Sequence, residues 1–268
     1  MHYDKIKEPL GRFFNKKPWM RKLFYRLLDL LLLRTWHVHR ELRKWRVIAP
    51  KDAHILDAGS GFGQYTYYMS TFSPSYNILG VDVKEEQVCD CNRFFHSIGK
   101  ENVLFKVGDL TTFRQEKAFD LVVCVDVMEH IEEDVTVLEN YHFSLKENGM
   151  LLISTPSDQG GSDVHEDGET SFIEEHVRDG YAMSELKEKM KRAGFSKVKA
   201  HYQYGKPGKI SWKMSMKWPM MMLNKSKAFF IILPFYYLIT FPFSLVLNWI
   251  DSQTAHHTGT GLIAVGWK

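Results

Sequence analysis

Cysteine is scarce in this chain, with three residues among 268, at positions 89, 91 and 124. Three thiols with this spacing provide neither a disulfide framework nor a zinc site, so we expect a reducing compartment and no secretion. Proline and glycine, with 9 and 18 residues, are too few for a collagen-like chain. Because 44% of the residues are hydrophobic and 25% are charged, the composition also excludes disorder and predicts one large domain or two small ones.

Net charge is also small, at +3, but the charges are segregated along the chain. Residues 1–50 contain 13 Lys and Arg against 4 Asp and Glu, and residues 204–250 contain six Lys and no acid. These segments carry +9 and +6, so the rest of the chain must carry −12. An acidic middle is thus flanked by two basic segments, both rich in aromatic and aliphatic residues.

The first basic segment predicts an amphipathic helix from Trp19 to Trp45, in which leucines recur at helical spacing between arginines and lysines. Its apolar stretch is about half of the roughly 20 residues that a membrane span needs, and Asp29 interrupts it, so we expect no crossing. No small-residue cleavage site follows, so a signal peptide is not expected either. Two interpretations stay open: a helix packed on the main domain, or a helix lying on an anionic membrane surface.

The second basic segment ends in a run without any charge, residues 228–250. Its 23 residues are enough for a transmembrane helix by length alone. Pro234 and Pro242 lie within the run, and each removes a backbone donor. We therefore expect a helix that is kinked or broken at these two positions.

Between residues 53 and 119, short β-rich runs alternate with segments of helical character. The runs read HILDAG, YNILGVD, NVLFKVGD and FDLVVCVD, and helices are expected from Gln64 and from Lys84. This alternation predicts an α/β fold in which helices cover both faces of a parallel sheet. Ligands of such sheets bind beyond the carboxyl ends of the strands, so the residues that follow each run are the first candidates for a site.

The first run ends in a glycine-rich loop, Asp57-Ala-Gly59-Ser-Gly61-Phe-Gly63, directly before a predicted helix. Glycines let the backbone turn tightly and approach a ligand without a Cβ in the way. A dinucleotide-binding loop needs its third glycine three places after the second, but position 64 is Gln. The loop therefore departs from the NAD pattern.

From about Ile55 to Phe195 the sequence resembles the class I S-adenosylmethionine-dependent methyltransferases. ILDAGSGFG resembles the family's glycine loop, ILGVD and VGDL match the acids that contact the ribose hydroxyls and the adenine amino group, and FDLVVCVDVMEHI matches the fourth strand and its turn. The resemblance implies S-adenosylmethionine as cofactor and a Rossmann-like sheet of seven strands, mostly parallel, with the last strand antiparallel. The cofactor-binding residues that it implies are Asp57, Gly59, Ser60, Gly61, Gly63, Asp82, Val83, Asp109, Leu110 and Asp126. Taken singly, Asp82 or Asp109 would also suit an ordinary loop acid or a helix cap.

Methyl transfer from a sulfonium is an in-line displacement, so the protein mainly aligns the reactants and sets the protonation state of the nucleophile. His130 follows the fourth strand near the expected methyl group, and neutral imidazole can take a proton from a hydroxyl, so we predict His130 as the base with Glu129 beside it. The alternative is that both residues only orient the turn and the cofactor. His165, in the acidic stretch 157–180, is a third catalytic candidate if that loop folds over the cleft.

The turn Asp126-Val-Met-Glu129-His130 is similar to the acid-x-x-Glu-His turn that can hold magnesium in ubiquinone-biosynthesis O-methyltransferases and small-RNA 2′-O-methyltransferases. The first acid is Asp here instead of Glu, and the shorter carboxylate displaces one oxygen of the octahedral shell that magnesium needs. We therefore predict no metal.

Residues 195–203 and 260–268 read as the sixth and seventh strands, which pair antiparallel in this family's fold. Residues 204–258 between them are then an insertion that must begin and end on the same side of any bilayer. We predict a basic helical extension over residues 1–50 and a methyltransferase domain over residues 51–268 that carries this insertion. Its lysines favour an interfacial or re-entrant hairpin, with a lid buried over the substrate pocket and a true span as alternatives.

Together these features predict a methyltransferase that is peripheral on the cytoplasmic face of a membrane and methylates an oxygen of a hydrophobic or lipid-like acceptor. One alternative is a soluble small-molecule methyltransferase whose insertion covers the pocket. A non-catalytic membrane scaffold is another, although a scaffold has no need of the intact set of cofactor residues. We expect no nucleic acid partner, because 23 uncharged residues exceed what base stacking uses and phosphate binding needs charge along a groove.

Overall fold

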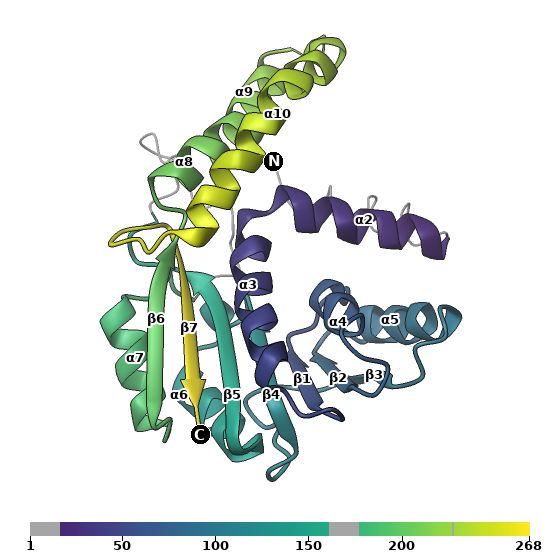
Figure 1. The fold of residues 1–268 in the computed structure, drawn as a ribbon, viewed down its shortest axis with the longest axis vertical. Helices are drawn as coiled ribbons and strands as arrows, with labels where there is room; N and C mark the ends of the chain where they lie inside the picture. Colours follow the sequence, from purple (N-terminus) through teal and green to yellow (C-terminus); the bar gives the residue numbers. More distant parts are fainter. Residues whose placement is uncertain (1–16, 161–176, 227) are drawn as a thin grey trace.

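One seven-stranded sheet forms the centre of the computed structural model, which describes residues 17–160, 177–226 and 228–268. Its strands are ordered β3-β2-β1-β4-β5-β7-β6 (Figure 1). β1 to β5 run parallel, and β7 pairs antiparallel with both β5 and β6, which confirms the predicted sheet. The strands are β1 (His54–Ala58), β2 (Asn77–Asp82), β3 (Val103–Val107), β4 (Phe119–Val125), β5 (Leu145–Pro156), β6 (Lys197–Gln203) and β7 (Gly261–Trp267).

Helices cover both faces of this sheet, so its central strands are apolar on both sides. Val122 and Cys124 of β4 face the helices α6 (Asp134–Ser144) and α7 (Met183–Arg192). Leu121 and Val123, one residue out of phase, face α3 (Leu33–Ile48), α4 (Gln64–Met69) and α5 (Glu85–Ser97). A strand that is buried on both faces reads as a continuous apolar run, as FDLVVCV does.

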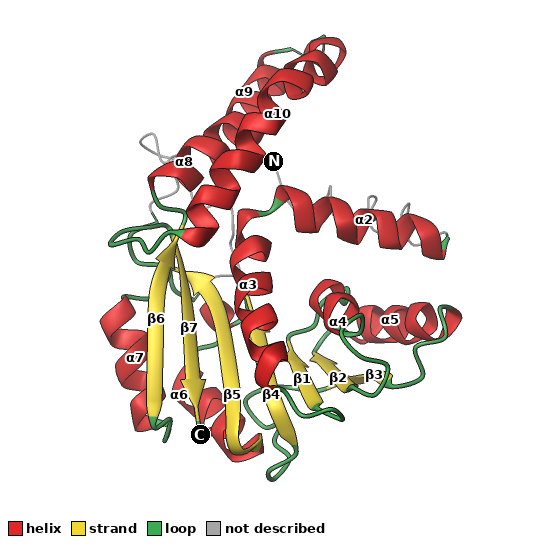
Figure 2. Ribbon diagram, in the orientation of Figure 1, coloured by secondary structure: helices red, strands yellow, loops and turns green. Residues whose placement is uncertain are grey.

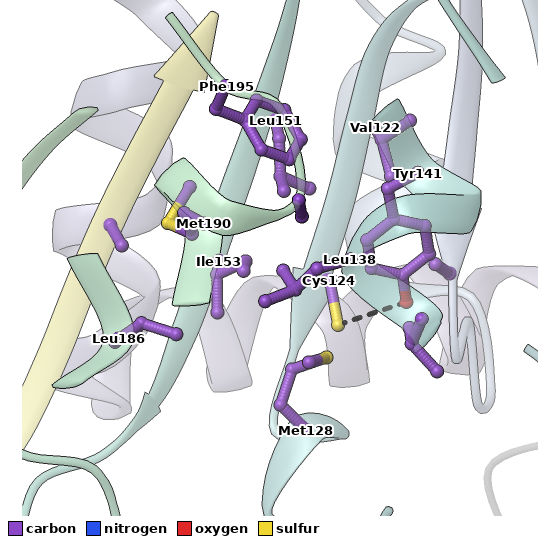
Figure 3. Packing of buried hydrophobic residues seen from close by; sticks show 14 of the residues in the cluster. Val122, Cys124, Met128, Leu138, Tyr141, Leu151, Ile153, Leu186, Met190 and Phe195 are labelled. Carbon is purple, nitrogen blue, oxygen red and sulfur yellow. Dashed lines mark hydrogen bonds between the residues drawn. The ribbon is translucent and has the colours of Figure 1, made fainter. Parts of the chain in front are cut away.

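The core on the α6 side is closely packed around Cys124 (Figure 3). Cys124 is fully buried among Met128, Leu138 and Tyr141, and the Tyr141 hydroxyl donates to its Sγ at 3.5 Å. Burial raises the pKa of the Cys124 thiol to about 12. Cys124 therefore acts as a small apolar side chain and not as a nucleophile.

The N-terminal segment forms two helices, so the prediction of one helix from Trp19 to Trp45 is wrong. α2 (Pro18–Leu31) and α3 are separated by Leu32, whose extended backbone (φ −89°, ψ 109°) turns the chain into a new direction (Figure 1). The two helices bury different faces against different partners, α2 against the glycine loop and α3 against the sheet. The segment thus packs on the main domain, the first of the two interpretations left open.

The insertion forms a helical hairpin that extends beyond the sheet edge where β5 and β6 end (Figure 2). One leg consists of α8 (Lys206–Trp212), the π-helical turn η2 (Lys213–Lys217) and α9 (Trp218–Lys225), and the other leg is α10 (Phe229–Gln253). The hydroxyls of Tyr236 and Tyr237 on α10 donate to the carbonyls of Met214 and Ser215, at 2.7 and 2.8 Å. These bonds satisfy carbonyls of the wide turn that precedes Pro219.

α10 is continuous over 25 residues, so the expected break at Pro234 and Pro242 does not occur, and the alternative, a kink at these positions, stays a prediction. Each proline deprives the carbonyl four residues earlier of its donor, and these carbonyls belong to Phe230 and Leu238, whose residues are exposed. Each proline therefore removes only one intrahelical hydrogen bond, and the helix continues through both positions. Within the described ranges, α10 is the one helix that is long and apolar enough to cross a membrane by length and composition.

The base of the hairpin is fastened to the domain by the fully buried carboxylate of Asp251. It contacts His37 Nε2 of α3 at 2.9 Å and accepts hydrogen bonds from the backbone N–H groups of Gly208 and Tyr204, at 2.9 and 3.2 Å. His256 Nε2 lies 3.1 Å from Oδ2 of Asp251, the oxygen that also accepts from Gly208. One side chain therefore ties α10 to α3 and to the start of α8.

Candidate cofactor and methyl-transfer site

The glycine loop between β1 and α4 holds three glycines in the left-handed region, with φ of +74° at Gly59, +51° at Gly61 and +79° at Gly63. A Cβ on Gly59 would lie 2.2 Å from a methyl carbon of Val127, in the turn after β4. The loop of β1 and the turn of β4 therefore touch each other, and only glycine allows that approach. A Cβ on Gly61 would meet no heavy atom closer than 3.8 Å, so the loop is open at its centre.

Asp82 ends β2 with its carboxylate directed at the glycine loop. Its Oδ2 accepts the N–H of Gly61 at 2.8 Å, and its Oδ1 accepts the N–H of Lys84 at 2.9 Å. The carboxylate is half-buried, and the neighbouring Val83 side chain is exposed. A carboxylate fixed in this way retains acceptor capacity for a pair of hydroxyl groups.

Asp109 and Leu110 follow β3 at the same edge of the sheet. Asp109 is exposed, and its Oδ1 accepts from the N–H and the hydroxyl of Thr111, at 2.9 and 2.8 Å. Leu110 is buried, and its carbonyl accepts from the Asn140 amide at 3.0 Å. The carboxylate of Asp109 thus shapes the loop while its free oxygen stays accessible.

Asp57 is more deeply buried than Asp82 and Asp109. It is 2% exposed, and the Thr66 hydroxyl donates to its Oδ2 at 2.5 Å. Burial raises the pKa of Asp57 to about 6, and the bond from Thr66 opposes that shift. Asp57 therefore supports the loop from below, and the hydroxyl of the neighbouring Ser60 is buried without a hydrogen-bond partner among the described residues.

The turn after β4 brings the predicted catalytic residues to this edge. Asp126 has a positive φ of +52° and forms an ion pair with Arg34 of α3. Glu129 lies in the short helix η1 (Met128–His130), is 1% exposed and accepts from the Thr155 hydroxyl at 3.1 Å, and burial raises its pKa. The side chain of His130 is exposed on the outside of the same turn. His165, the third catalytic candidate, lies outside the described residues.

The N-terminal helices contribute side chains to the site that the sequence did not reveal. Arg34 reaches Asp126, its backbone N–H donates to the Tyr204 hydroxyl at 3.1 Å, and Thr35 Oγ1 lies 3.4 Å from the Tyr65 hydroxyl. In the sequence, Arg34 is one cation among many on an amphipathic segment, a pattern typical of a solvated face. The unusual signal was a cation directly after an uninterrupted run of leucines, where the two helices meet.

These residues fit a cofactor that carries a ribose and an amino-acid group. The centre of the loop is open, since even a Cβ on Gly61 would contact no heavy atom closer than 3.8 Å. The Ser60 hydroxyl has no hydrogen-bond partner among the described residues, and the Asp82 carboxylate faces the loop. In the described part of the chain, no group of three or more His, Cys, Asp or Glu side chains is arranged to hold a metal ion.

The chain matches a family model described as a methyltransferase domain over residues 50–217. Among curated proteins, it is 26% identical over 174 residues to the tRNA U34 carboxymethyltransferase of Nautilia profundicola, covering 60% of this chain and 53% of the relative. It is also 26% identical over 101 residues to the ubiquinone biosynthesis O-methyltransferase of Rickettsia felis, covering 38% of this chain and 40% of the relative. The chain thus spans about half the length of the curated relatives that it matches.

Among solved structures, the chain is similar to phosphoethanolamine N-methyltransferase 2 of Haemonchus contortus in complex with S-adenosyl-L-methionine. The TM-score is 0.59 at 16% sequence identity, and the match covers 86% of this chain and 52% of that chain. At this identity the likeness shows the fold alone.

The strand order and the glycine loop define the class I fold of S-adenosylmethionine-dependent methyltransferases. The chain belongs to the methyltransferase domain family. The predicted family, fold, enzyme class and cofactor, S-adenosylmethionine, are thereby confirmed. The roles of the individual site residues stay predictions.

Proposed function

We propose that this protein methylates a hydrophobic or lipid-like acceptor, at an oxygen atom, on the surface of a membrane. S-adenosylmethionine supplies an electrophilic methyl group. In this proposal Asp82 and Asp109 orient the nucleoside part, and the turn after β4 presents the acceptor. Glu129 or His130 removes the acceptor proton, and the raised pKa of Glu129 brings that carboxyl nearer to the operating pH that favours a general base.

The exposure of α10 is the observation that carries the membrane part of the proposal. Only 11% of its apolar window is buried, although the window has a mean hydropathy of 2.0. Soluble monomers rarely expose contiguous apolar patches larger than a few hundred Å². The exposed side chains of this helix are Phe230, Ile231, Ile232, Phe235, Leu238, Ile239, Phe243, Val246, Trp249 and Ile250.

Charge on the other leg supports an anionic lipid surface as the partner of this face. Lys206, Lys209 and Lys225 are exposed along the leg that precedes α10, and no acid lies between residues 204 and 250. Lysines near an anionic membrane contribute on the order of 1 kcal/mol each. The hairpin therefore combines an apolar face with cations and suits an interfacial position.

A lid over the substrate pocket, the runner-up interpretation, requires α10 to bury its apolar face against the domain. The helix instead extends past the sheet edge (Figure 1). Its central residues Phe235 and Leu238 are 68% and 76% exposed. The arrangement therefore favours the membrane over a lid.

Flotation with phosphatidylcholine and phosphatidylserine vesicles tests the proposal. Wild type should float, and the double substitution Phe235→Asp/Leu238→Asp should strongly reduce flotation. The matched control is Val47→Asp/Ile48→Asp, which changes two side chains that are equally exposed but lie on α3, and it should float like wild type. Equal flotation of the two double variants would refute the membrane role of α10.

The acceptor is tested by methyl transfer from labelled cofactor into a total lipid and metabolite extract, with each product identified by mass. Label in a lipid-phase product supports the proposal. Label in RNA or only in water-soluble metabolites would refute it. A wild-type protein that binds no S-adenosylmethionine would favour the non-catalytic scaffold.

A further inference from the structure

α2 has its amphipathic faces reversed relative to an ordinary surface helix. Its apolar side chains Trp19, Leu23, Leu27 and Leu30 are 61%, 44%, 39% and 36% exposed. They recur every three or four residues and so form one stripe along the helix. The stripe faces away from the domain, because the opposite face of α2 packs against it.

The packed face of α2 is polar and grips the glycine loop. Arg21 and Tyr25, which are 2% and 0% exposed, both donate to the carbonyl of Phe62, at 2.8 and 2.5 Å. Arg21 also donates to Asp90 of α5 at 2.6 Å. Because Phe62 lies between Gly61 and Gly63, α2 holds the same loop that Asp82 holds at Gly61.

The charges on α2 point to an anionic lipid surface as the occupant of the stripe. Lys17 and Arg26 are exposed and Lys22 is partly exposed, so cations border the stripe. Asp29 is the one acid of this helix, and it is turned inward, where it accepts from the Gln64 amide at 2.7 Å. An apolar stripe bordered by cations, with its acid turned away, matches an anionic bilayer.

We propose that α2 binds an anionic bilayer through this stripe and that the bilayer thereby holds the cofactor loop closed. A helix of 14 residues is marginal on its own in water, so two contacts that order the same helix support each other. The lipid contact and the loop contact use opposite faces and are compatible. The inference rests on the proposed function, because it assumes that the protein acts on the surface of a bilayer.

The test measures the coupling in both directions, because linkage requires the two effects to be equal. S-adenosylhomocysteine affinity is measured by calorimetry with and without phosphatidylcholine and phosphatidylserine vesicles, and vesicle affinity is measured with and without saturating S-adenosylhomocysteine. In wild type each affinity should rise by the same factor, at least about fivefold.

The double variant Leu23→Glu/Leu27→Glu should lose this coupling while it still binds vesicles through α10. Its S-adenosylhomocysteine affinity without lipid should equal that of wild type, because both side chains are exposed. Val47→Glu/Ile48→Glu, on α3, is the matched control and should keep the coupling.

Three results would overturn the inference: vesicles that leave or weaken the cofactor affinity of wild type, coupling that survives in the Leu23/Leu27 variant, or a wild-type protein that binds no vesicles. Methyl transfer is not part of this readout. A protein that shows coupling but methylates no lipid would therefore refute the proposed function and support the inference.

Discussion

Two apolar segments of this chain, β5 and α10, lie in opposite environments, one in the core and one on the surface. Leu151 and Leu152 of β5 are fully buried, whereas Phe235 and Leu238 of α10 are 68% and 76% exposed. The difference lies in what covers them, because helices of the same chain cover both faces of the sheet and only one leg of the hairpin covers α10. Apolar composition thus identifies surface that needs a partner, and the fold decides whether that partner belongs to the chain.

The largest expected effect on stability comes from the same substitution, Leu to Asp, made once in β5 and once in α10. Leu152→Asp places an unpaired carboxylate in the core and should lower the free energy of unfolding by more than about 4 kcal/mol. Leu238→Asp should change it by less than about 0.5 kcal/mol in the absence of lipid, because this side chain is exposed. Denaturant unfolding measures both, and a large loss for Leu238→Asp would mean that α10 is a buried element of the fold.

The second largest effect is expected at Asp251, the joint that connects the helical hairpin to the sheet domain. Asp251→Ala leaves buried donors, including His37, without their acceptor and should cost about 3–5 kcal/mol. Limited proteolysis should then cut first near residues 204–212, where the hairpin begins. Asp134→Ala removes a comparable carboxylate, bonded to Tyr181 and Lys189 at the far side of the sheet, and should not expose the hairpin. Equal cutting in both variants would contradict the role of Asp251 as the joint.

Loss of the β2 acid should affect the sheet region alone. Asp82→Ala should weaken S-adenosylhomocysteine binding at least about 100-fold, equivalent to about 2.8 kcal/mol, because the loop loses its anchor and the ribose its acceptor. Vesicle binding without cofactor should be unchanged. Asp52→Ala, in the exposed turn before β1, is the control and should bind as wild type. Calorimetry that shows similar affinity for both variants would remove Asp82 from the cofactor site.

The smallest effect depends on pH and on a buried histidine of α3. Burial, and to a smaller extent the nearby charge of Arg43, lowers the pKa of His39 from 6.5 to about 3. Below pH 6.5 the unfolded chain takes up a proton at this position and the folded chain does not, so stability falls as the pH falls. At pH 5 the cost is about 2 kcal/mol.

His39→Phe retains the stacking on Tyr68 and should flatten the stability curve between pH 7 and pH 5 by about that amount. The control is His96→Phe, at an exposed position of α5, which should leave the curve unchanged. The pKa values of His37 and His201 are also lowered by burial, so these two residues account for the pH dependence of stability that remains in His39→Phe. An unchanged curve in His39→Phe would show that His39 is protonated in the folded state.

The sequence predicted the part of the molecule whose interactions are local or periodic. Strand ends and the glycine loop follow from apolar runs and from residues that only a tight turn requires, whereas the antiparallel seventh strand was implied by the family resemblance. The break at Leu32 lacks a Gly or Pro signal, because it arises from two helices that pack on different surfaces. α10 runs through its prolines because each removes only one bond of a 25-residue helix, and the proline positions alone did not show that the helix would continue.

Within the candidate site the same division applies. Asp57 and Asp82 lie at the ends of β1 and β2, and Asp109 and Asp126 follow β3 and β4, so the strand pattern was enough to bring them to one edge. Arg34 reaches that edge through the docking of α3, and Glu129 is buried while His130 is exposed, which depends on how the short helix η1 is oriented. Spacing along the chain carries none of this information.

Methyl transfer into vesicles made from a total lipid extract tests the central claim most directly, with wild type and Phe235→Asp/Leu238→Asp compared at saturating S-adenosylmethionine. We predict a labelled lipid-phase product with wild type and a much slower formation of it with the variant, although both proteins bind the cofactor equally in the absence of lipid. The same product at the same rate with both proteins, or label only in a water-soluble product, would contradict the account.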